Sequence, residues 1–430
     1  MHRKDIMLAL CFAGAGCALL LVMFLPVGSG GMWGAQSAAA FFTQSITVEQ
    51  IQNNYHNANI GGAVVAASPA PPQPAQKVRV LIVPGHQPRD GGTEFNGVYE
   101  RDVVVDIANA LARLLGQNTH YVVMVARSKT AWNPLLQSYF DTRAGNIVAF
   151  QKSQSLQMAR HLADGKILPA DEKVYHNTAP DLAVFQLYGI NKWASDEKYD
   201  ITLHLHVNDD AKRRLRREGE YGGFSIYVPD RQYSNAKASR AIAESIAVRL
   251  NAYHATSTLP KEDVGVVEDQ ELIAIGSNNS VDGAALLIEY GYIYEPQFQE
   301  ASVLPTVVAD YAYQTYLGLQ DFFHDPVYPT YGSISLPYDF ANVTAKKDES
   351  GAGVYALQVA LRHLGYYPPV GKTFAECPVA GVVGACTQSA LKAYQSAHDL
   401  EATGLLGPKT RSVLSAEIAA SRATMPALIK

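Results

Sequence analysis

The apolar and polar positions of the chain predict an α/β body over residues 77–325. The apolar run 78–83 (VRVLIV) is typical of a strand buried on both faces, and apolar residues at helical spacing predict a helix over 101–115. The same patterns predict further strands at 121–125, 200–207 and 284–288, and helices at 234–253 and 300–323. Because strands alternate with helices, we expect a twisted, mostly parallel sheet with helices on both faces.

A different pattern follows this body. Residues 326–350 are rich in proline and polar turn residues and predict a linker. Three short amphipathic stretches separated by glycine-rich turns then predict a small three-helix domain over 351–416, and residues 417–430 are expected to form a tail.

The N-terminal end predicts export. Residues 6–25 form twenty consecutive positions without a charged or strongly polar side chain, which is enough helix to cross a bilayer. Arg3 and Lys4 precede this run and no Lys or Arg follows before Lys77, so the N-terminus is expected in the cytoplasm. Residues 1–27 are therefore either an uncleaved signal anchor, with the membrane as a partner, or a cleaved signal peptide. Both interpretations place the body outside the cytoplasm, after a linker over 28–76 that is Pro/Ala-rich at its end.

Composition excludes two classes of protein. A hydrophobic share of 48% and a charged share of 17% exclude a globally disordered chain. With 35 Lys+Arg against 40 Asp+Glu, the net charge is −5, and we expect no nucleic-acid partner.

The four cysteines fall into two pairs. Cys11 and Cys17 lie inside the apolar run. Cys377 and Cys386 are nine positions apart in the part that is expected to be exported, which predicts a disulfide.

Four polar residues stand where the predicted elements begin or end. His86 follows the first strand, Glu100 precedes the first long helix, and His206 ends the strand 200–207. Two imidazoles and one carboxylate suit Zn²⁺ with an open fourth position. Glu289 directly follows the buried run AALLI and is a candidate general base, with a pKa that burial is expected to raise. Spacing alone does not separate such a site from ordinary structural residues.

These residues lie in motifs that resemble the zinc-dependent N-acetylmuramoyl-L-alanine amidases of the amidase-3 type. The motifs are VPGHQPRDGGTEFNGVYERD, with His86, Asp90, Gly97 and Glu100; HLHVN, with His206 and Asn208; and LIEYGY, with Glu289 and Gly291. The resemblance covers about residues 78–323 and implies that His86, Glu100 and His206 bind zinc and that Glu289 is catalytic. It implies hydrolysis of the amide between N-acetylmuramic acid and L-alanine of peptidoglycan.

The sequence departs from this family at several positions. Val83, Gln87 and His204 replace residues usual in the motifs, and His204 is either a rival ligand or a structural residue. The long insertion 128–195 carries aromatic residues that either wall a groove or form a local core, and one of its helices could cover the site. The run KRRLRREGE at 212–220 is either a solvated loop or a contact for carboxylates and anionic wall polymers.

The C-terminal module resembles the three-helix peptidoglycan-binding domain found beside many wall hydrolases. The matching segments include LGY at 364–366, GVVG at 381–384 and GLLGPKT at 404–410. The implied partner is peptidoglycan, and a protein activator is a further candidate partner. Two alternatives stay open: a non-catalytic scaffold that binds the wall, and a zinc peptidase acting on stem peptides.

Overall fold

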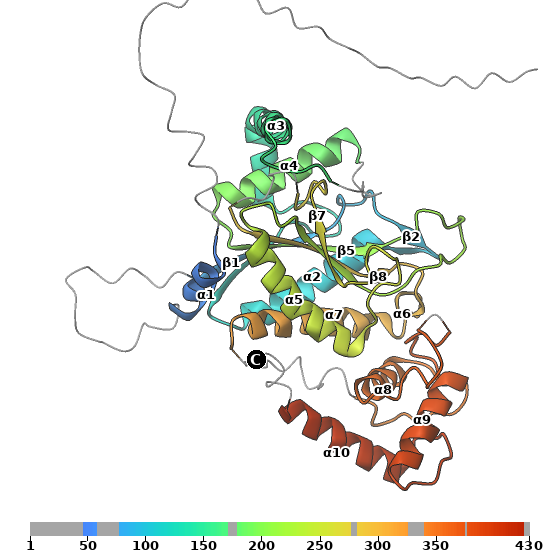
Figure 1. The fold of residues 1–430 in the computed structure, drawn as a ribbon. Coiled ribbons are helices and arrows are strands. Elements are labelled where there is room, and N and C mark those ends of the chain that lie inside the picture. The colour runs from blue at the N-terminus through green and yellow to red at the C-terminus, as the bar shows by residue number, and fades with distance from the viewer. Residues whose placement is uncertain are drawn as a thin grey trace, which may run out of the picture. The chain divides into compact units, whose positions relative to one another are not determined.

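A six-stranded sheet forms the centre of the computed structural model, which describes residues 46–57, 77–170, 179–276, 282–325, 339–374 and 376–424. The strand order is β4-β1-β5-β8-β6-β7, and only the β6–β8 pair is antiparallel (Figure 1). The strands are β1 (Val78–Pro84), β4 (Tyr121–Val125), β5 (Ile201–Asn208), β6 (Ser225–Pro229), β7 (Val266–Asp269) and β8 (Ala284–Tyr292). The mostly parallel α/β sheet predicted from the sequence is thus confirmed.

Three long helices cover one face of the sheet. They are α2 (Glu100–Gly116), α5 (Ala236–Tyr253) and α7 (Leu304–Phe322). Leu203 and Leu205 of β5 and Ile288 of β8 are fully buried in the same apolar cluster as these helices. This continuous core fixes the position of the central strands.

The insertion covers the opposite face with a helical hairpin, as Figure 1 shows above the sheet. Its helices are α3 (Pro134–Ala163) and α4 (Asp181–Asp196). Phe140, Tyr188 and Trp193 are buried in a cluster with Leu81 and Val83 of β1. For these three aromatic residues, the structure supports the interpretation as a local core.

Short elements lead into the first long helix. Strands β2 (Glu94–Phe95) and β3 (Val98–Tyr99) form a hairpin closed by Asn96 and Gly97. Both turn residues have positive φ, 51° and 84°, as the two-residue turn of a tight hairpin requires. The hairpin ends directly at Glu100, so it sets where α2 begins. A further short helix, α6 (Pro296–Gln299), precedes α7.

Helix α1 (Val48–Asn57) lies within the segment that the sequence assigned to a linker. It begins with a capping box, in which Thr47 N–H donates to Gln50 Oε1 (2.7 Å) and Gln50 N–H donates to Thr47 Oγ1 (3.1 Å). Ile51 and Tyr55 are fully buried in the main core, so α1 is part of the α/β body.

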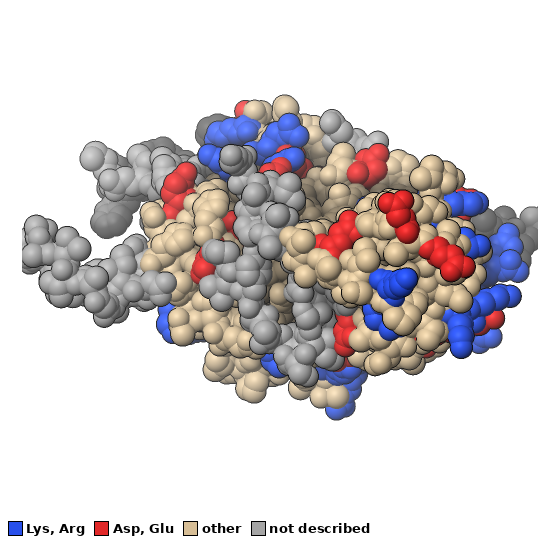
Figure 2. Space-filling model, turned by 90° about the horizontal axis from the view of Figure 1, so that it is seen from below, with Lys and Arg blue, Asp and Glu red and all other residues tan. Residues whose placement is uncertain are grey.

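The C-terminal module contains three helices, as predicted. They are α8 (Ala352–His363), α9 (Ala385–Ala397) and α10 (Pro408–Thr424), the last of which extends into the predicted tail. The disulfide between Cys377 and Cys386 is present, with a Cα–Cα distance of 5.8 Å. Figure 2 shows acidic and basic side chains interspersed over one face of the molecule.

The predicted membrane segment at 6–25 lies outside the described residues and stays a prediction. Among the helices that the structure does describe, none combines the length and apolar character needed to cross a bilayer.

Candidate functional site

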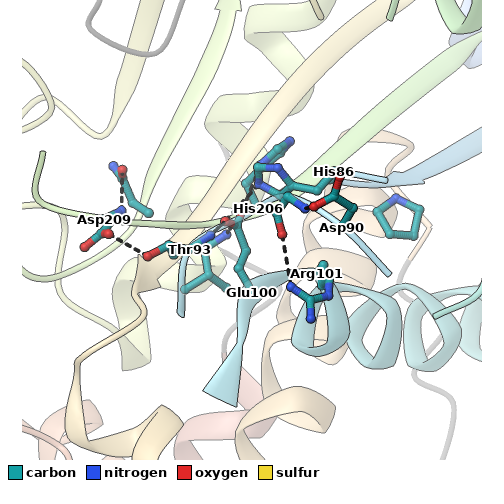
Figure 3. A network of polar contacts seen from close by, with 12 residues as sticks. His86, Asp90, Thr93, Glu100, Arg101, His206 and Asp209 are labelled. Carbon is teal, nitrogen blue, oxygen red and sulfur yellow. Dashed lines mark hydrogen bonds and ion pairs between the residues drawn. The ribbon is translucent and has the colours of Figure 1, made fainter. Parts of the chain in front are cut away.

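Three predicted ligands converge at the carboxyl edge of the sheet (Figure 3). His86 Nε2 lies 2.8 Å from Glu100 Oε2, and His206 Nδ1 lies 3.0 Å from Glu100 Oε1. One donor atom from each residue lies within 4.8 Å of the other two. The residues come from the loop after β1, the first turn of α2 and strand β5, so the sheet topology brings together residues 120 positions apart in sequence.

Gly85 allows this close approach. Its N–H donates to the carbonyl of Leu205 (2.8 Å), which ties the loop to β5. A methyl group on Gly85 would lie 2.2 Å from Cε1 of His206, so any side chain there would displace the His206 ring. The next residue, His86, has a φ of 66°, a backbone conformation uncommon outside glycine.

Arg127 braces the same loop, and sequence reasoning missed it. The side chain is 2% exposed and donates to the carbonyls of Pro84 (3.1 Å), Gly85 and Arg101 (3.0 Å). Burial lowers its pKa to about 10, so the guanidinium keeps its charge at neutral pH. The available signal was a cation two residues after the strand 121–125, at the same sheet edge as His86.

The environment of Glu100 favours its ionised form. Its carboxylate accepts hydrogen bonds from the backbone N–H groups of Thr93 (3.0 Å) and Val207 (3.2 Å). Burial alone would raise the pKa of Glu100, but the charge of His86 and hydrogen bonds from both imidazoles hold it well below the usual range. A carboxylate held in this form is ready to bind a cation.

Glu289 lies beside the three candidate ligands. It pairs in register with His206 across β5 and β8 and is 6% exposed. Its Oε2 atom has no hydrogen-bond partner among the described residues. Burial raises the pKa of Glu289 well above its usual range, and the charges of Glu100 and Glu262 add to the effect.

His204 does not join the three converging residues. The group of donor atoms found in the described chain contains His86, Glu100 and His206 but not His204. His204 is fully buried two residues earlier on β5, and neither ring nitrogen has a partner among the described residues. Burial, followed by the charge of His206, lowers its pKa to about 3, so the imidazole is neutral at physiological pH.

The remaining motif residues support the loops around the site. Asp90 accepts a hydrogen bond from the N–H of Gly91 (2.8 Å), and Asn208 donates to the buried carboxylate of Glu262 (3.2 Å). Within the basic run, Arg213 is ion-paired with Asp209 and largely buried. The other four cations of the run are exposed: Lys212, Arg214, Arg216 and Arg217.

A cavity of about 730 Å³ extends from the three candidate ligands to the inserted hairpin. Val83, Leu287 and Glu289 line it from the sheet. The insertion contributes Trp132, the segment 179–180 and one side of α4. Of the aromatic residues in the described part of the insertion, Trp132 lines the cavity, and the insertion therefore forms one wall of the candidate site.

The fold and the converging donors define an α/β protein with a candidate metal centre beside a buried carboxylate. The chain belongs to the N-acetylmuramoyl-L-alanine amidase family, whose model matches residues 80–321. A peptidoglycan binding domain matches residues 350–414. The protein is therefore a cell-wall amidase that acts outside the cytoplasm.

Solved structures of amidases are similar to this chain. An N-acetylmuramoyl-L-alanine amidase from Clostridium difficile 630 is 16% identical, with a TM-score of 0.37, over 58% of this chain and 99% of that one. Ami1 from Mycobacterium smegmatis is 12% identical, with a TM-score of 0.38, over 57% and 97%. CwlD from Clostridioides difficile, solved with the GerS lipoprotein, is 13% identical, with a TM-score of 0.38, over 58% and 99%. Among curated proteins, none matches the chain.

Proposed function

We propose that this amidase is zinc-dependent, that His86, Glu100 and His206 hold the zinc, and that Glu289 is its catalytic residue. The observation that carries the proposal is the convergence of three donor atoms within 4.8 Å of one another, beside a buried carboxyl group. The substrate is the amide between the lactyl group of N-acetylmuramic acid and the L-alanine of the stem peptide, in keeping with the family.

The donor set fits zinc. Two imidazoles and one carboxylate are a common protein contribution to a catalytic zinc site, which keeps a fourth position open. Hydrogen bonds from Thr93 and Val207 orient the Glu100 carboxylate, as outer partners of metal ligands do. Bound zinc supplies Lewis acidity, which polarises the scissile carbonyl and lowers the pKa of a water molecule.

Glu289 moves the proton. Its carboxylate takes the proton that the attacking water loses and delivers it to the alanine nitrogen as the C–N bond breaks. The products are a muramoyl carboxylate and a stem peptide with a free amino terminus. Because burial raises the pKa of Glu289, the carboxyl group holds a proton at a pH where an exposed glutamate has lost it. Its Oε2 atom, which has no partner among the residues that the structure describes, is suited to carry that proton.

The other parts of the chain place the enzyme on its substrate. The peptidoglycan binding domain holds it on the wall, and the apolar run 6–25 anchors it in the membrane or directs its secretion. A protein activator is part of the same proposal, as a regulator of access to the site.

Digestion of purified peptidoglycan by the full chain tests the reaction and the metal together. We expect free peptides that begin with L-alanine, identified by mass spectrometry. Prolonged treatment with EDTA should abolish their release, and added Zn²⁺ should restore it.

Other products would contradict the proposal in distinct ways. Cut stem peptides that stay attached to muramic acid would favour the peptidase alternative. Wall binding without any product, in protein that carries zinc, would favour the non-catalytic scaffold. Activity that survives complete zinc removal would contradict the metal assignment.

A further inference from the structure

Helix α4 presents a nearly uniform apolar stripe to the cavity. The residues that line the cavity from this helix recur at helical spacing: Leu182, Ala183, Gln186, Leu187 and Ile190. Four of them are apolar, and Gln186 is the polar one. The same cavity contains His86 and Glu289, so Gln186 belongs to the space in which the substrate reacts.

Gln186 has an unused acceptor. Its Oε1 atom is buried and has no hydrogen-bond partner among the described residues. A buried acceptor without a partner destabilises the fold, and an aliphatic residue would suit the stripe better. Asn191 on the same helix shows the structural alternative, since it is 3% exposed and donates to the carbonyl of Ile273 (3.0 Å). The Oε1 atom of Gln186 lacks such a partner in the described part of the chain, which indicates that a ligand supplies one.

The chemistry of a carboxamide identifies the ligand group. A glutamine side chain both donates and accepts hydrogen bonds, so its natural complement is a secondary amide with one N–H and one C=O. The proposed substrate offers two such groups near the scissile bond. One is the peptide bond after L-alanine, and the other is the acetamido group of muramic acid.

We propose that Gln186 is a substrate-binding residue whose carboxamide hydrogen-bonds a secondary amide of the substrate in the cavity below α4. This inference rests on the proposed function, because the amide belongs to that substrate. It gives the insertion a role in substrate recognition, with apolar side chains of α4 on either side of the bound amide.

Calorimetric binding of N-acetylmuramoyl-L-alanyl-D-isoglutamine tests the inference. Every protein in this comparison is the full chain with the substitution E289Q, so that the ligand binds without being cleaved. We expect Gln186→Leu to weaken binding roughly 2- to 12-fold, the loss of one hydrogen bond. Gln137→Leu is the matched control, since Gln137 is an exposed glutamine of the same insertion that donates to Asp141 (2.9 Å). The control should leave the affinity unchanged.

Two ligand analogues locate the amide. In one, an ester replaces the peptide bond after alanine; in the other, a hydroxyl replaces the acetamido group. The loss of affinity caused by Q186L should disappear with the analogue that lacks the partner of Gln186, and it should persist with the other analogue. If Q186L and its parent bind the ester equally well, the peptide bond is the partner of Gln186. If they bind the hydroxyl sugar equally well, the acetamido group is the partner.

Three results would overturn the inference. The first two are an unchanged affinity in Q186L and an equal loss of affinity in Q186L for both analogues and the parent ligand. The third is that N-acetylmuramoyl-L-alanyl-D-isoglutamine does not bind to the E289Q chain. The proposed function is judged separately, by whether the unsubstituted chain releases L-alanyl peptides from peptidoglycan.

Discussion

On the face covered by α2, α5 and α7, strand side chains such as Leu203 and Leu205 are buried in continuous apolar packing. On the face below α3 and α4, the alternate residues His204 and His206 meet a cavity instead. Because successive side chains of a strand point to opposite faces, the five residues of β5 from Leu203 to Val207 serve both purposes. One face holds the strand in place, and the other can therefore carry polar groups that lack protein partners.

The largest effect expected on the cavity face is on catalysis. Glu289→Gln keeps the size of the side chain but cannot accept the proton, so we expect kcat to fall by about 10²–10⁴-fold. The fold should stay unchanged, because glutamine keeps the size of the buried side chain and adds no charge. Peptide release and circular dichroism measure the two effects. A variant that keeps a tenth of the activity would contradict the catalytic assignment.

Substitutions on the packed face should lower the stability of the fold. Leu205 is fully buried, and Leu205→Ala should lower the free energy of unfolding by about 2–5 kcal/mol. Leu182 at the cavity is 56% exposed, and Leu182→Ala should cost about 0.5 kcal/mol or less. Urea unfolding followed by the fluorescence of Trp132 and Trp193 compares the variants. Equal losses would mean that the two faces are packed alike.

The smallest effect concerns pH. The pKa of His204 is about 3 in the folded chain and about 6.5 when unfolded, so acid protonates the unfolded state first. Stability should therefore fall between pH 7 and pH 5, with His204 contributing about 2 kcal/mol of the loss. Between pH 7 and pH 5, the free energy of unfolding of His204→Leu should fall by about 2 kcal/mol less than that of the unsubstituted chain. Urea titrations in EDTA keep the metal out of the comparison, and identical pH profiles would contradict the assignment.

Parts of the fold with strong periodicity could be predicted from sequence. Strand β1, helix α2 and strand β8 follow long apolar patterns, although β8 extends beyond the predicted end through Glu289 to Tyr292. Strands β6 and β7 were missed, because five and four residues are too short to separate a strand from a loop by pattern. Helix α1 was missed because its apolar positions are few, yet the T-x-x-Q signature of its capping box at 47–50 was readable.

The residues of the candidate site also fall into two groups, those that the sequence could identify and those that it could not. The candidate ligands and Glu289 stand at the ends of predicted elements, so motif resemblance could locate them. The roles of Arg127 and Gln186 could not be predicted from sequence, because each depends on contacts with distant segments. Arg127 binds the loop after β1 from another strand end, and Gln186 faces the cavity only once the insertion has folded over the sheet.

Gly85 carries no functional group, yet the position constrains the site as tightly as a ligand does. Any methyl added there would occupy the place of the His206 ring. In a library of all single substitutions, residue 85 should tolerate as little change as the three candidate metal ligands. A map of mutational tolerance would therefore count it among the active-site residues, although no atom of a side chain is there to act.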